Sequence, residues 1–443
     1  MSYTSPQHST RGGVRARTSL LWTLAAALLL VAAAAVTVAW VNPWNQAEVA
    51  APPPAEEAVP SSAQVVPETP TVPDPPPEPE PETTAEFTLA FGGDMLIHMP
   101  VADSAWVNDR EMDFAPLMEP IRPYIEGADL AICNMETPVA APGEAPSGYP
   151  LFAAPTELVA GMVETGWDGC STSTNHSVDR GFQGIVDTLD LFDQAGLGHV
   201  GTARTEAESE QPQLYELESA DHKIVIAHLS AGFDLNGLPV PEEAPWSWNE
   251  IDIDRLIGEA ERAREDGADL VIASIHCCQV EYTTIPEDYQ VEIAQALAES
   301  GLVDLFISHH AHVPKTMDLL PGGPTGGGMW AAYGLGNFIS NQSVDCCVPE
   351  TSTGLVAFIT FEQVGEAHPE VIEASWIGAT MDFGAGHRVV PLLADGADSE
   401  TLDESEAAYR RALLEDILEG SPAVPRTEPP ESDSQVTVVQ RSQ

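Results

Sequence analysis

The chain has 443 residues, and 69 acidic against 17 basic side chains give it a formal net charge of −52. This charge argues strongly against nucleic acid as a partner and disfavours adhesion to anionic lipid headgroups, because both are bound by basic surfaces. Hydrophobic residues make up 43% of the chain, which is ample for a large core. The length alone is consistent with one large domain or two smaller ones.

The first predicted element is a transmembrane helix over residues 20–41. This segment carries no charged side chain and exceeds the roughly 20 apolar residues that a bilayer core requires. Three arginines precede it, so we expect residues 1–19 in the cytoplasm and the following domain outside the cell, held by a single membrane pass. A cleaved signal peptide is the alternative, although its apolar region would be only about 7–15 residues long.

Two segments rich in proline and acidic residues flank the expected folded part. Residues 42–85 contain few large apolar side chains and cannot build a core. We expect them to form an extended, disordered linker that carries the domain away from the membrane. Residues 420–443 are expected to be a second disordered segment, which leaves a folded domain over residues 86–419.

Strands and helices alternate through the folded part up to Gly326. Apolar runs separated by amphipathic segments of about 10–15 residues indicate an α/β domain with much parallel sheet. After Gly326 the runs follow one another with little helix between them, so we expect an added, mostly antiparallel portion. The strands expected before Gly326 are 87–94, 129–136, 167–175, 222–230, 269–276 and 302–310, and the helices are 114–128, 155–166, 181–196, 252–268 and 286–301.

Polar side chains stand at the carboxyl ends of these strands. Ligands of open α/β sheets bind outside that edge, and carboxylate, amide oxygen and imidazole are ligands for divalent ions such as Mn, Fe or Zn. Any one of these residues alone is more often a helix cap or a surface group, but their repetition at one edge indicates a metal site. The residues are Asp94, Asn134, Glu136, Asn175, His176, His276, His309, His310 and His312.

Six motifs add a resemblance to a known family. FGGDMLIH, NMETP, STSTNHSVDRG, EYTTIPEDYQ, SHHAHVPK and YGLGNFISNQ occur within about residues 87–345. In order and spacing they resemble the bacterial poly-γ-glutamate capsule-synthesis (CapA-type) proteins of the calcineurin-like metallophosphoesterase superfamily. The resemblance implies a four-layer α/β/β/α sandwich that holds two divalent metal ions.

The resemblance also implies roles for individual residues. His176 would be the imidazole near the leaving group, and His98 is a second candidate catalytic residue. The implied metal ligands are Asp94, Glu136, Asn175, His276, His310 and His312.

The three histidines of SHHAHVPK differ in their expected direction. Side chains alternate along an extended backbone, so His310 and His312 can reach one site together. His309 is then expected to point away from the site into solvent.

The chain departs from the superfamily pattern at two places. Leu96 stands where the first motif usually carries a histidine, so a site for one ion is an alternative to a site for two. Cys277 and Cys278 replace a usual Trp-Gly, with one residue more before Glu281. The second departure concerns the local loop and leaves His276 as a ligand.

Six cysteines are expected in an extracellular domain, where disulfides persist. The pairs 277–278 and 346–347 follow two site motifs, and a disulfide between the two pairs would hold both loops at one cleft. Bonds within each pair are possible but strained, and the sequence leaves the connectivity open. Cys133 and Cys170 lie inside apolar strands and are expected to be buried free thiols.

Two classes of function fit these features. The first is a membrane-anchored, metal-dependent hydrolase, acting on a phosphoester by superfamily analogy or on an amide or ester of a surface polymer by family analogy. The second is a non-catalytic metal-binding surface protein that binds or escorts an anionic polymer. The expected partner is poly-γ-glutamate or another cell-wall polymer. To bind a polyanion, this acidic chain would need its negative charge compensated locally by metals and by Arg180, Arg204 or Lys315.

Overall fold

The computed structural model describes residues 83–442, apart from positions 109, 221, 398 and 400. The predicted transmembrane helix over residues 20–41 and nearly all of the predicted linker lie outside the described residues. Within the described part of the chain, no helix combines the length and the apolar character needed to cross a bilayer.

A large mixed sheet forms one half of the fold. Its central strand, β1 (Thr84–Met95), runs parallel to the β4 strand on one side and antiparallel to the β14 strand on the other. A short strand, β13 (Asn337–Ile339), also pairs with β1, at its carboxyl end. The strand order is β17 (Gly396–Ala397), β16 (Arg388–Leu393), β15 (Glu370–Asp382), β14 (Thr353–Val364), β1, β4 (Leu130–Asn134), β5 (Gly169–Ser171) and β6 (Gly198–Val200).

A second sheet faces the first, and a small hairpin of β2 (Trp106–Asn108) and β3 (Glu111–Met112) stands apart from both. The second sheet has a parallel centre, as the alternation of strands and helices predicts. Its order is β11 (Met317–Leu320), β12 (Met329–Ala332), β10 (Leu305–His309), β9 (Leu270–His276), β8 (His222–Gly232), β7 (Gln213–Ser219) and β19 (Gln435–Val439).

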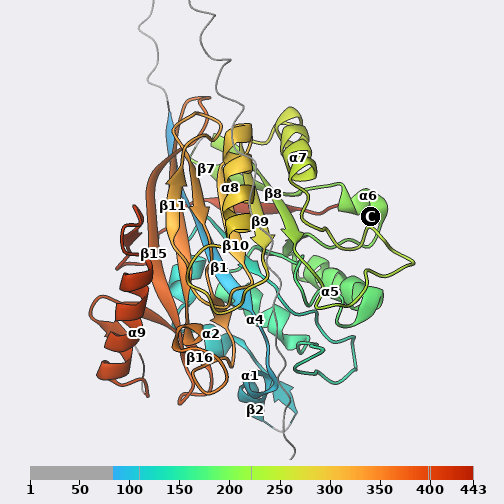
Figure 1. The fold of residues 1–443 in the computed structure, drawn as a ribbon, viewed down its shortest axis with the longest axis vertical. Coiled ribbons are helices and arrows are strands. Elements are labelled where there is room, and N and C mark those ends of the chain that lie inside the picture. Colours follow the sequence, from blue (N-terminus) through green and yellow to red (C-terminus); the bar gives the residue numbers. More distant parts are fainter. Residues whose placement is uncertain (1–82, 109, 221, 398, 400, 443) are drawn as a thin grey trace, which may run out of the picture. The chain divides into compact units, whose positions relative to one another are not determined.

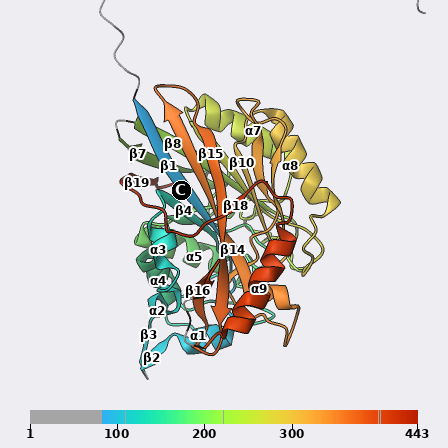
Figure 2. The ribbon, with the colours of Figure 1, turned by 90° about the vertical axis from the view of Figure 1, so that its left-hand side faces the viewer.

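Helices cover the outer face of each sheet, as Figures 1 and 2 show. The α2, α3, α4 and α5 helices pack on the large sheet, and α7 and α8 pack on the second sheet. The helices are α1 (Met99–Ser104), α2 (Ala115–Met118), α3 (Arg122–Glu126), α4 (Glu157–Thr165), α5 (Gly181–Ala195), α6 (Glu206–Ser209), α7 (Ile253–Glu265), α8 (Asp288–Ser300) and α9 (Glu404–Ile417), with a 3₁₀ turn at Pro349–Ser352.

The core between the sheets follows from the alternation of side chains along β1. Phe87, Leu89 and Phe91 point between the sheets, where they join Ile226 of β8 and Ile307 of β10. The intervening Ala90 joins the separate core under α2–α5. The domain is therefore a mixed α/β sandwich in which two stacked sheets lie between two layers of helices. The antiparallel strands β14, β15 and β16 supply the addition predicted after Gly326.

The C-terminal segment is ordered on the domain, so the prediction of disorder for residues 420–443 is wrong over the described residues to 442. The short strand β18 (Val424–Pro425) pairs with β15, and β19 pairs with β7 at the edge of the second sheet. Val436 and Val438 alternate along β19 and pack against the core between the sheets. Burial of these alternating apolar side chains orders the segment in spite of the proline-rich and acidic composition around it.

The cysteines pair differently from the predictions. Cys133 and Cys170 form a disulfide instead of remaining free, because β4 and β5 are adjacent and hold these two residues in register, with their Cα atoms 4.4 Å apart. In the 277–278 and 346–347 pairs each cysteine bonds to its chain neighbour, so the predicted bond between the two loops is not formed. The first pair is buried in the core under α7 and α8, whereas Cys346 lies on an exposed loop.

Candidate metal centre

The Gly-Gly-Asp segment at the carboxyl end of β1 positions Asp94, a buried residue of the site. The register of β1 shifts between Asp94 and Met95, so the strand is irregular at its carboxyl end. The Asp94 backbone N–H donates to the Gly336 carbonyl at 2.9 Å. A Cβ atom on Gly93 would lie 2.0 Å from that carbonyl oxygen, so only glycine permits this approach.

Asp94, Glu136 and His312 form the centre of the site. One ligand atom from each lies within 4.8 Å of the others, and all three side chains are buried. His312 Nδ1 is 3.3 Å from Asp94 Oδ2, and His312 Nε2 is 3.7 Å from Glu136 Oε1. Asp94 Oδ2 and both carboxylate oxygens of Glu136 are buried without a hydrogen-bond partner.

A second group of predicted ligands adjoins this centre. His276 Nε2 lies 3.0 Å from the Asn175 side-chain oxygen, so the two atoms can face one ion. The His310 ring lies 5.0 Å from the His276 ring and 6.1 Å from the His312 ring, measured between centroids. His310 Nδ1 is also buried without a partner. The structure thus brings all six predicted ligands to one edge of the sheets.

The protonation of the site follows from burial and from the opposed charges. Burial raises the pKa of Glu136 well above its usual value, and the nearby Asp94 raises it further. Burial lowers the pKa of His310 to about 4 and that of His276 well below its usual value. At His312 the lowering effect of burial is outweighed by Glu136 and Asp94, which raise its pKa to about 9.

The donor set fits divalent metal ions. Burial of two carboxylates with three oxygen atoms lacking hydrogen-bond partners is unfavourable unless a cation compensates them. The low pKa values keep His276 and His310 neutral, the form in which imidazole binds a metal. Carboxylate, amide oxygen and imidazole together suit Mn, Fe or Zn.

The prediction for His309 is wrong. His309 is buried, and its Nδ1 lies 3.6 Å from Asp94 Oδ1 without a hydrogen-bond partner. The strand β10 ends at His309, and His310 and His312 adopt positive φ angles of 87° and 58°. The period of two therefore does not extend across these three histidines, because the backbone leaves the extended conformation after His309.

The two predicted catalytic histidines both pack against Phe152. The Phe152 ring packs edge-on against His176 at 4.8 Å and against His98 at 5.3 Å, between ring centroids. His176 Nδ1 is 2.7 Å from the carboxylate of Asp179, which fixes the direction of its ring. His98 instead places Nδ1 3.1 Å from the Leu96 carbonyl oxygen.

Two asparagines in the site lay outside the predicted ligand set. The amide nitrogen of Asn134 donates to Asp94 Oδ1 at 2.8 Å and lies 3.2 Å from His276 Nδ1, which links the two groups of ligands. The Asn337 side-chain oxygen is 3.1 Å from His312 Nδ1. Both residues occur at strand positions paired with Asp94, a register that the quoted motifs could have indicated.

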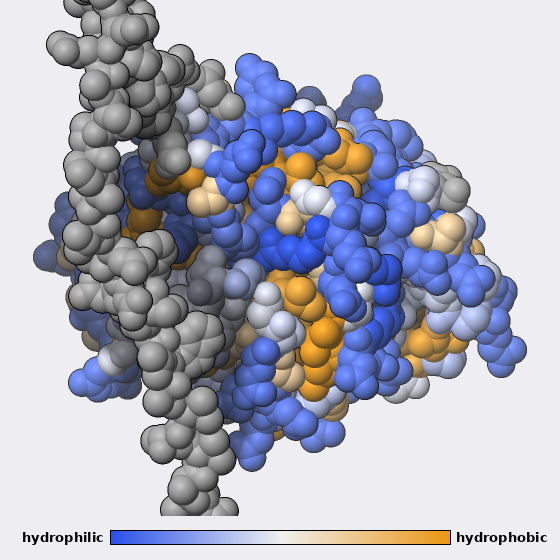
Figure 3. Space-filling view, turned by 90° about the horizontal axis from the view of Figure 1, so that it is seen from above, coloured by the Kyte–Doolittle hydropathy of each residue, from blue (hydrophilic) through white to orange (hydrophobic). Residues whose placement is uncertain are grey.

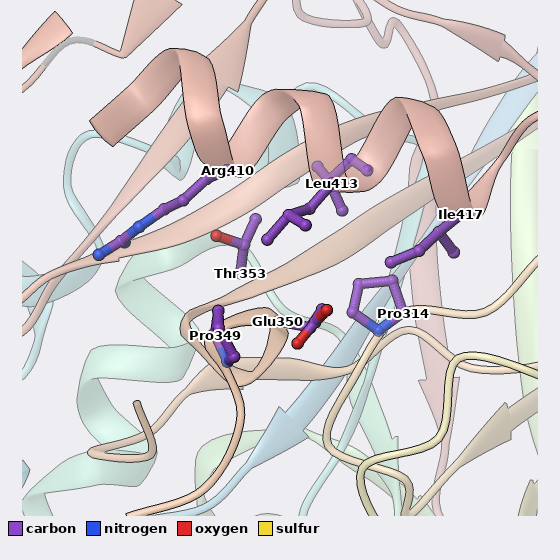
Figure 4. Close-up of a pocket in the computed structure, with 8 residues that line it drawn as sticks. Pro314, Pro349, Glu350, Thr353, Arg410, Leu413 and Ile417 are labelled. Carbon is purple, nitrogen blue, oxygen red and sulfur yellow. The ribbon is translucent and has the colours of Figure 1, made fainter. Parts of the chain in front are cut away.

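The loop that carries His312 is supported from behind by α9. Pro314 follows His312 by two residues and faces Leu413 and Ile417 of that helix, as Figure 4 shows. The space between them leaves no room for a water molecule. This packing fixes the loop, and with it the imidazole of His312.

Comparison with known proteins gives the chain its family. The model of the family described as "Bacterial capsule synthesis protein PGA_cap" matches residues 88–342, which is more than half of the chain and includes every predicted site residue. The chain belongs to this family. The matched region begins within β1 and ends beyond Asn337.

Curated relatives match the same region at moderate identity. The "PGA biosynthesis protein CapA" of Bacillus subtilis is 27% identical over 230 residues, which cover 50% of this chain and 56% of the relative. A "Probable polyglutamine synthesis accessory protein" of Mycobacterium tuberculosis is 23% identical over 224 residues, or 48% of this chain and 56% of that protein. The chain therefore spans about half the length of the curated relatives it matches.

Solved structures show only a distant likeness. An NAD nucleotidase of Haemophilus influenzae has a TM-score of 0.41 and 10% identity, over 78% of this chain and 58% of the other. The calcineurin-like phosphoesterase YfkN of Bacillus subtilis has a TM-score of 0.36 and 14% identity, over 67% of this chain and 91% of the other. Both TM-scores are low, and neither likeness bears on the function of this chain.

Proposed function

We propose that this member of the capsule synthesis family is a divalent-metal-dependent hydrolase that acts in the synthesis of poly-γ-glutamate or another surface polymer. The observation that carries the proposal is the buried group of Asp94, Glu136 and His312, in which Asp94 Oδ2 and both Glu136 carboxylate oxygens lack hydrogen-bond partners. His312 opposes these carboxylates, which raise its pKa to about 9, and a divalent ion would replace the imidazole proton as the compensating charge.

The ligands divide into two neighbouring groups that can hold the ions. Asp94, Glu136 and His312 form the first, and His276, Asn175 and His310 form the second. When bound, divalent ions supply an activated water and stabilise the negative charge that develops during hydrolysis. Asn134 holds the two groups in register through its contacts with Asp94 and His276.

His176 is the proposed proton donor to the leaving group. Its Nδ1–H donates a hydrogen bond to the Asp179 carboxylate, so Nε2 is the ring nitrogen that can exchange a proton with the substrate. Asn236, from the loop after β8, lies 3.3 Å from that Nε2 and also contacts the Asn175 backbone. Phe152 packs against the ring and excludes water from one side.

The proposal includes the cellular setting. The uncharged segment at residues 20–41 and the arginines before it support a membrane anchor with the domain outside the cell. Protease added to intact cells should then remove the domain and leave the N-terminus protected. Protection of the domain would overturn the orientation, and release of a soluble protein that begins near residue 40 would show cleavage instead.

The decisive experiment combines elemental analysis of the purified protein with hydrolysis assays on phosphomonoesters, phosphodiesters and poly-γ-glutamate. We expect bound Mn, Fe or Zn and turnover of at least one substrate that a chelator abolishes and the metal restores. Bound metal without turnover, together with saturable polymer binding, would support the non-catalytic escort. Protein purified without metal that binds none on titration would sink both forms of the proposal.

A further inference from the structure

A cavity of about 200 Å³ lies at the opposite end of β10 from the candidate metal centre. Asp304, which lines it, immediately precedes β10, whereas His309 is the last residue of that strand. Five residues of β-strand separate the two ends by roughly 17 Å. Figure 3 looks onto the end of the domain at which β1 begins and shows hydrophobic residues gathered between hydrophilic ones.

Apolar side chains form one wall of the cavity. Trp330 of β12 is half-buried, and its register partner Leu319 on β11 is 44% exposed. Val371 of β15 and Pro324 of the glycine-rich loop lie on the same cavity. An indole beside exposed aliphatic carbon is a flat platform that gains by covering a ligand's apolar face.

The polar wall consists mainly of hydrogen-bond acceptors. His368 Nε2 is 2.8 Å from Asp304 Oδ1, so the imidazole donates to this carboxylate and leaves its Nδ1 as an acceptor. The other Asp304 oxygen accepts from the Arg264 guanidinium and from the Val271 backbone N–H. Glu370, an exposed side chain, adds a second carboxylate.

These features select among ligand classes. The residues that line the cavity include no lysine or arginine, so an anion such as phosphate or polyglutamate would meet carboxylates without a paired cation. Attraction for a cation is weak as well, because Arg264 compensates Asp304 and water screens Glu370. A neutral ligand with an apolar face and hydroxyl donors matches both walls.

We propose that this cavity binds a neutral pyranose of a glycan chain, with the ring's C–H face on Trp330 and its hydroxyls donating to His368 and Glu370. The site is separate from the metal centre and does not depend on hydrolysis. It would hold the domain on a neutral wall glycan while the other end of the sheets acts on its substrate.

The test is calorimetric titration of the full-length protein with an uncharged N-acetylglucosamine oligomer, a short poly-γ-glutamate and an oligolysine. Saturable binding of the neutral oligomer that persists after chelation of metals is expected, with no saturable binding of the two charged probes at this cavity. Failure of the neutral oligomer to bind, or binding of oligolysine alone, would overturn the proposal. A metal-free protein that retains glycan binding but lacks turnover separates this proposal from the proposed function.

Two variants and a matched control locate the binding. Trp330→Ala should weaken binding roughly tenfold or more through loss of stacking. Leu319→Ser, at an exposed position, should weaken binding without a risk to folding. Ile372→Ser removes an aliphatic group of similar exposure, 51% against 44% for Leu319, that does not line the cavity. Equal affinity of the Leu319 and Ile372 variants would place the glycan elsewhere and contradict the proposal.

Discussion

Two polar clusters in this domain both combine aspartate, glutamate and histidine but differ in how their charges are paired. In the candidate metal centre, Asp94 and Glu136 present carboxylate oxygens with no hydrogen-bond partner. In the other cluster, which we call the arginine cluster, every carboxylate meets a guanidinium. Its members are Asp190, Asp193, His199, Arg204, Glu208 and Arg441.

The arginine cluster joins the C-terminus to the rest of the domain. Arg204 binds Glu208 through two nitrogen atoms, at 2.5 and 3.2 Å. Arg441 is buried and donates to the Glu208 carbonyl, the Thr202 carbonyl and His199 Nδ1 at 2.8–3.0 Å. The carboxylates and guanidiniums compensate one another, so the cluster needs no external ion.

The comparison shows that pairing distinguishes a structural cluster from a site. Burial opposes ionisation in both clusters. At Glu208 the two arginines outweigh burial and lower the pKa, whereas at Glu136 burial prevails and the pKa is raised. A cluster whose carboxylates are not paired with guanidinium groups favours the binding of a cation, whereas a cluster with such pairs stabilises the fold.

The sharpest test of this difference is Asp94→Asn. The substitution should reduce metal affinity by more than the roughly 10–100-fold typical of residues around a ligand and should remove chelator-sensitive turnover. In the metal-free protein the change in the free energy of unfolding should be small, because the relief of a buried carboxylate is offset by the loss of its interactions with His312 and Asn134. Elemental analysis and urea unfolding of the chelated protein measure the two effects.

Asp129→Asn is the matched control for that test. Asp129 is also buried and immediately precedes β4, the strand next to β1, but its oxygens accept from the Thr88 backbone N–H and the Ser432 hydroxyl. Metal content should stay unchanged, and the metal-free stability should fall by more than in Asp94→Asn. An equally large fall in the Asp94 variant would mean that Asp94 is paired as fully as Asp129.

The fold and the membership of the site could be predicted to a large extent from the sequence. Alternating strands and helices specify the parallel centre, and the strand ends carry the six predicted ligands to one edge. Side-chain direction within SHHAHVPK could not be predicted, because it depends on the positive φ angles of His310 and His312. The loop that adopts these angles contacts Asn337 and α9, which are not local to it in sequence.

Pairing between segments distant in sequence was the second feature that could not be predicted. Cys133 and Cys170 come together only because β4 and β5 are neighbours in register, so apolar surroundings alone misled the prediction of free thiols. The C-terminal segment was misread for a similar reason. Its composition is that of a disordered tail, and the β7 edge and the arginine cluster that order it lie more than two hundred residues away.

Removal of the shared carboxylate should destabilise the arginine cluster. Glu208→Gln leaves Arg204 and Arg441 buried with fewer compensating charges, so the free energy of unfolding should fall by roughly 3 kcal/mol. Urea denaturation followed by circular dichroism measures this change. Glu206→Gln, on the exposed side of the same short helix, should have little effect. An unchanged free energy of unfolding in Glu208→Gln would show that the cluster does not stabilise the fold.

Arg441→Met should have a smaller effect than Glu208→Gln. Glu208 keeps its two contacts with Arg204, but His199 Nδ1 and two backbone carbonyls lose their donor. We expect a loss of about 2 kcal/mol in unfolding free energy and faster proteolysis within residues 420–443. The control Lys223→Met removes an exposed ion pair with Glu216 and should cost less than about 1 kcal/mol. Equal losses of unfolding free energy in Arg441→Met and Lys223→Met would contradict an anchoring role for Arg441.

The pH dependence of stability gives the finest comparison, through His199. Burial lowers the pKa of His199 to about 4, although Asp193 accepts its Nε2 proton and opposes the shift. An unfolded histidine has a pKa of about 6.5, so between about pH 6.5 and 4 the unfolded chain binds a proton that the folded protein does not. Stability should therefore fall as the pH falls through this window.

The contribution of His199 to this slope is about 1.4 kcal/mol per pH unit. His199→Gln removes the titrating group, so its unfolding free energy should depend less steeply on pH than that of the parent protein by that amount. Both proteins are measured without metal, and the remaining histidines contribute equally to each and cancel in the difference. Asp193 and Glu208 have lowered pKa values and act chiefly at lower pH. If the two proteins show parallel curves of unfolding free energy between pH 6.5 and 4, His199 is protonated in the folded cluster, beside Arg441. The cluster would then carry one more positive charge than the neutral imidazole assumed here.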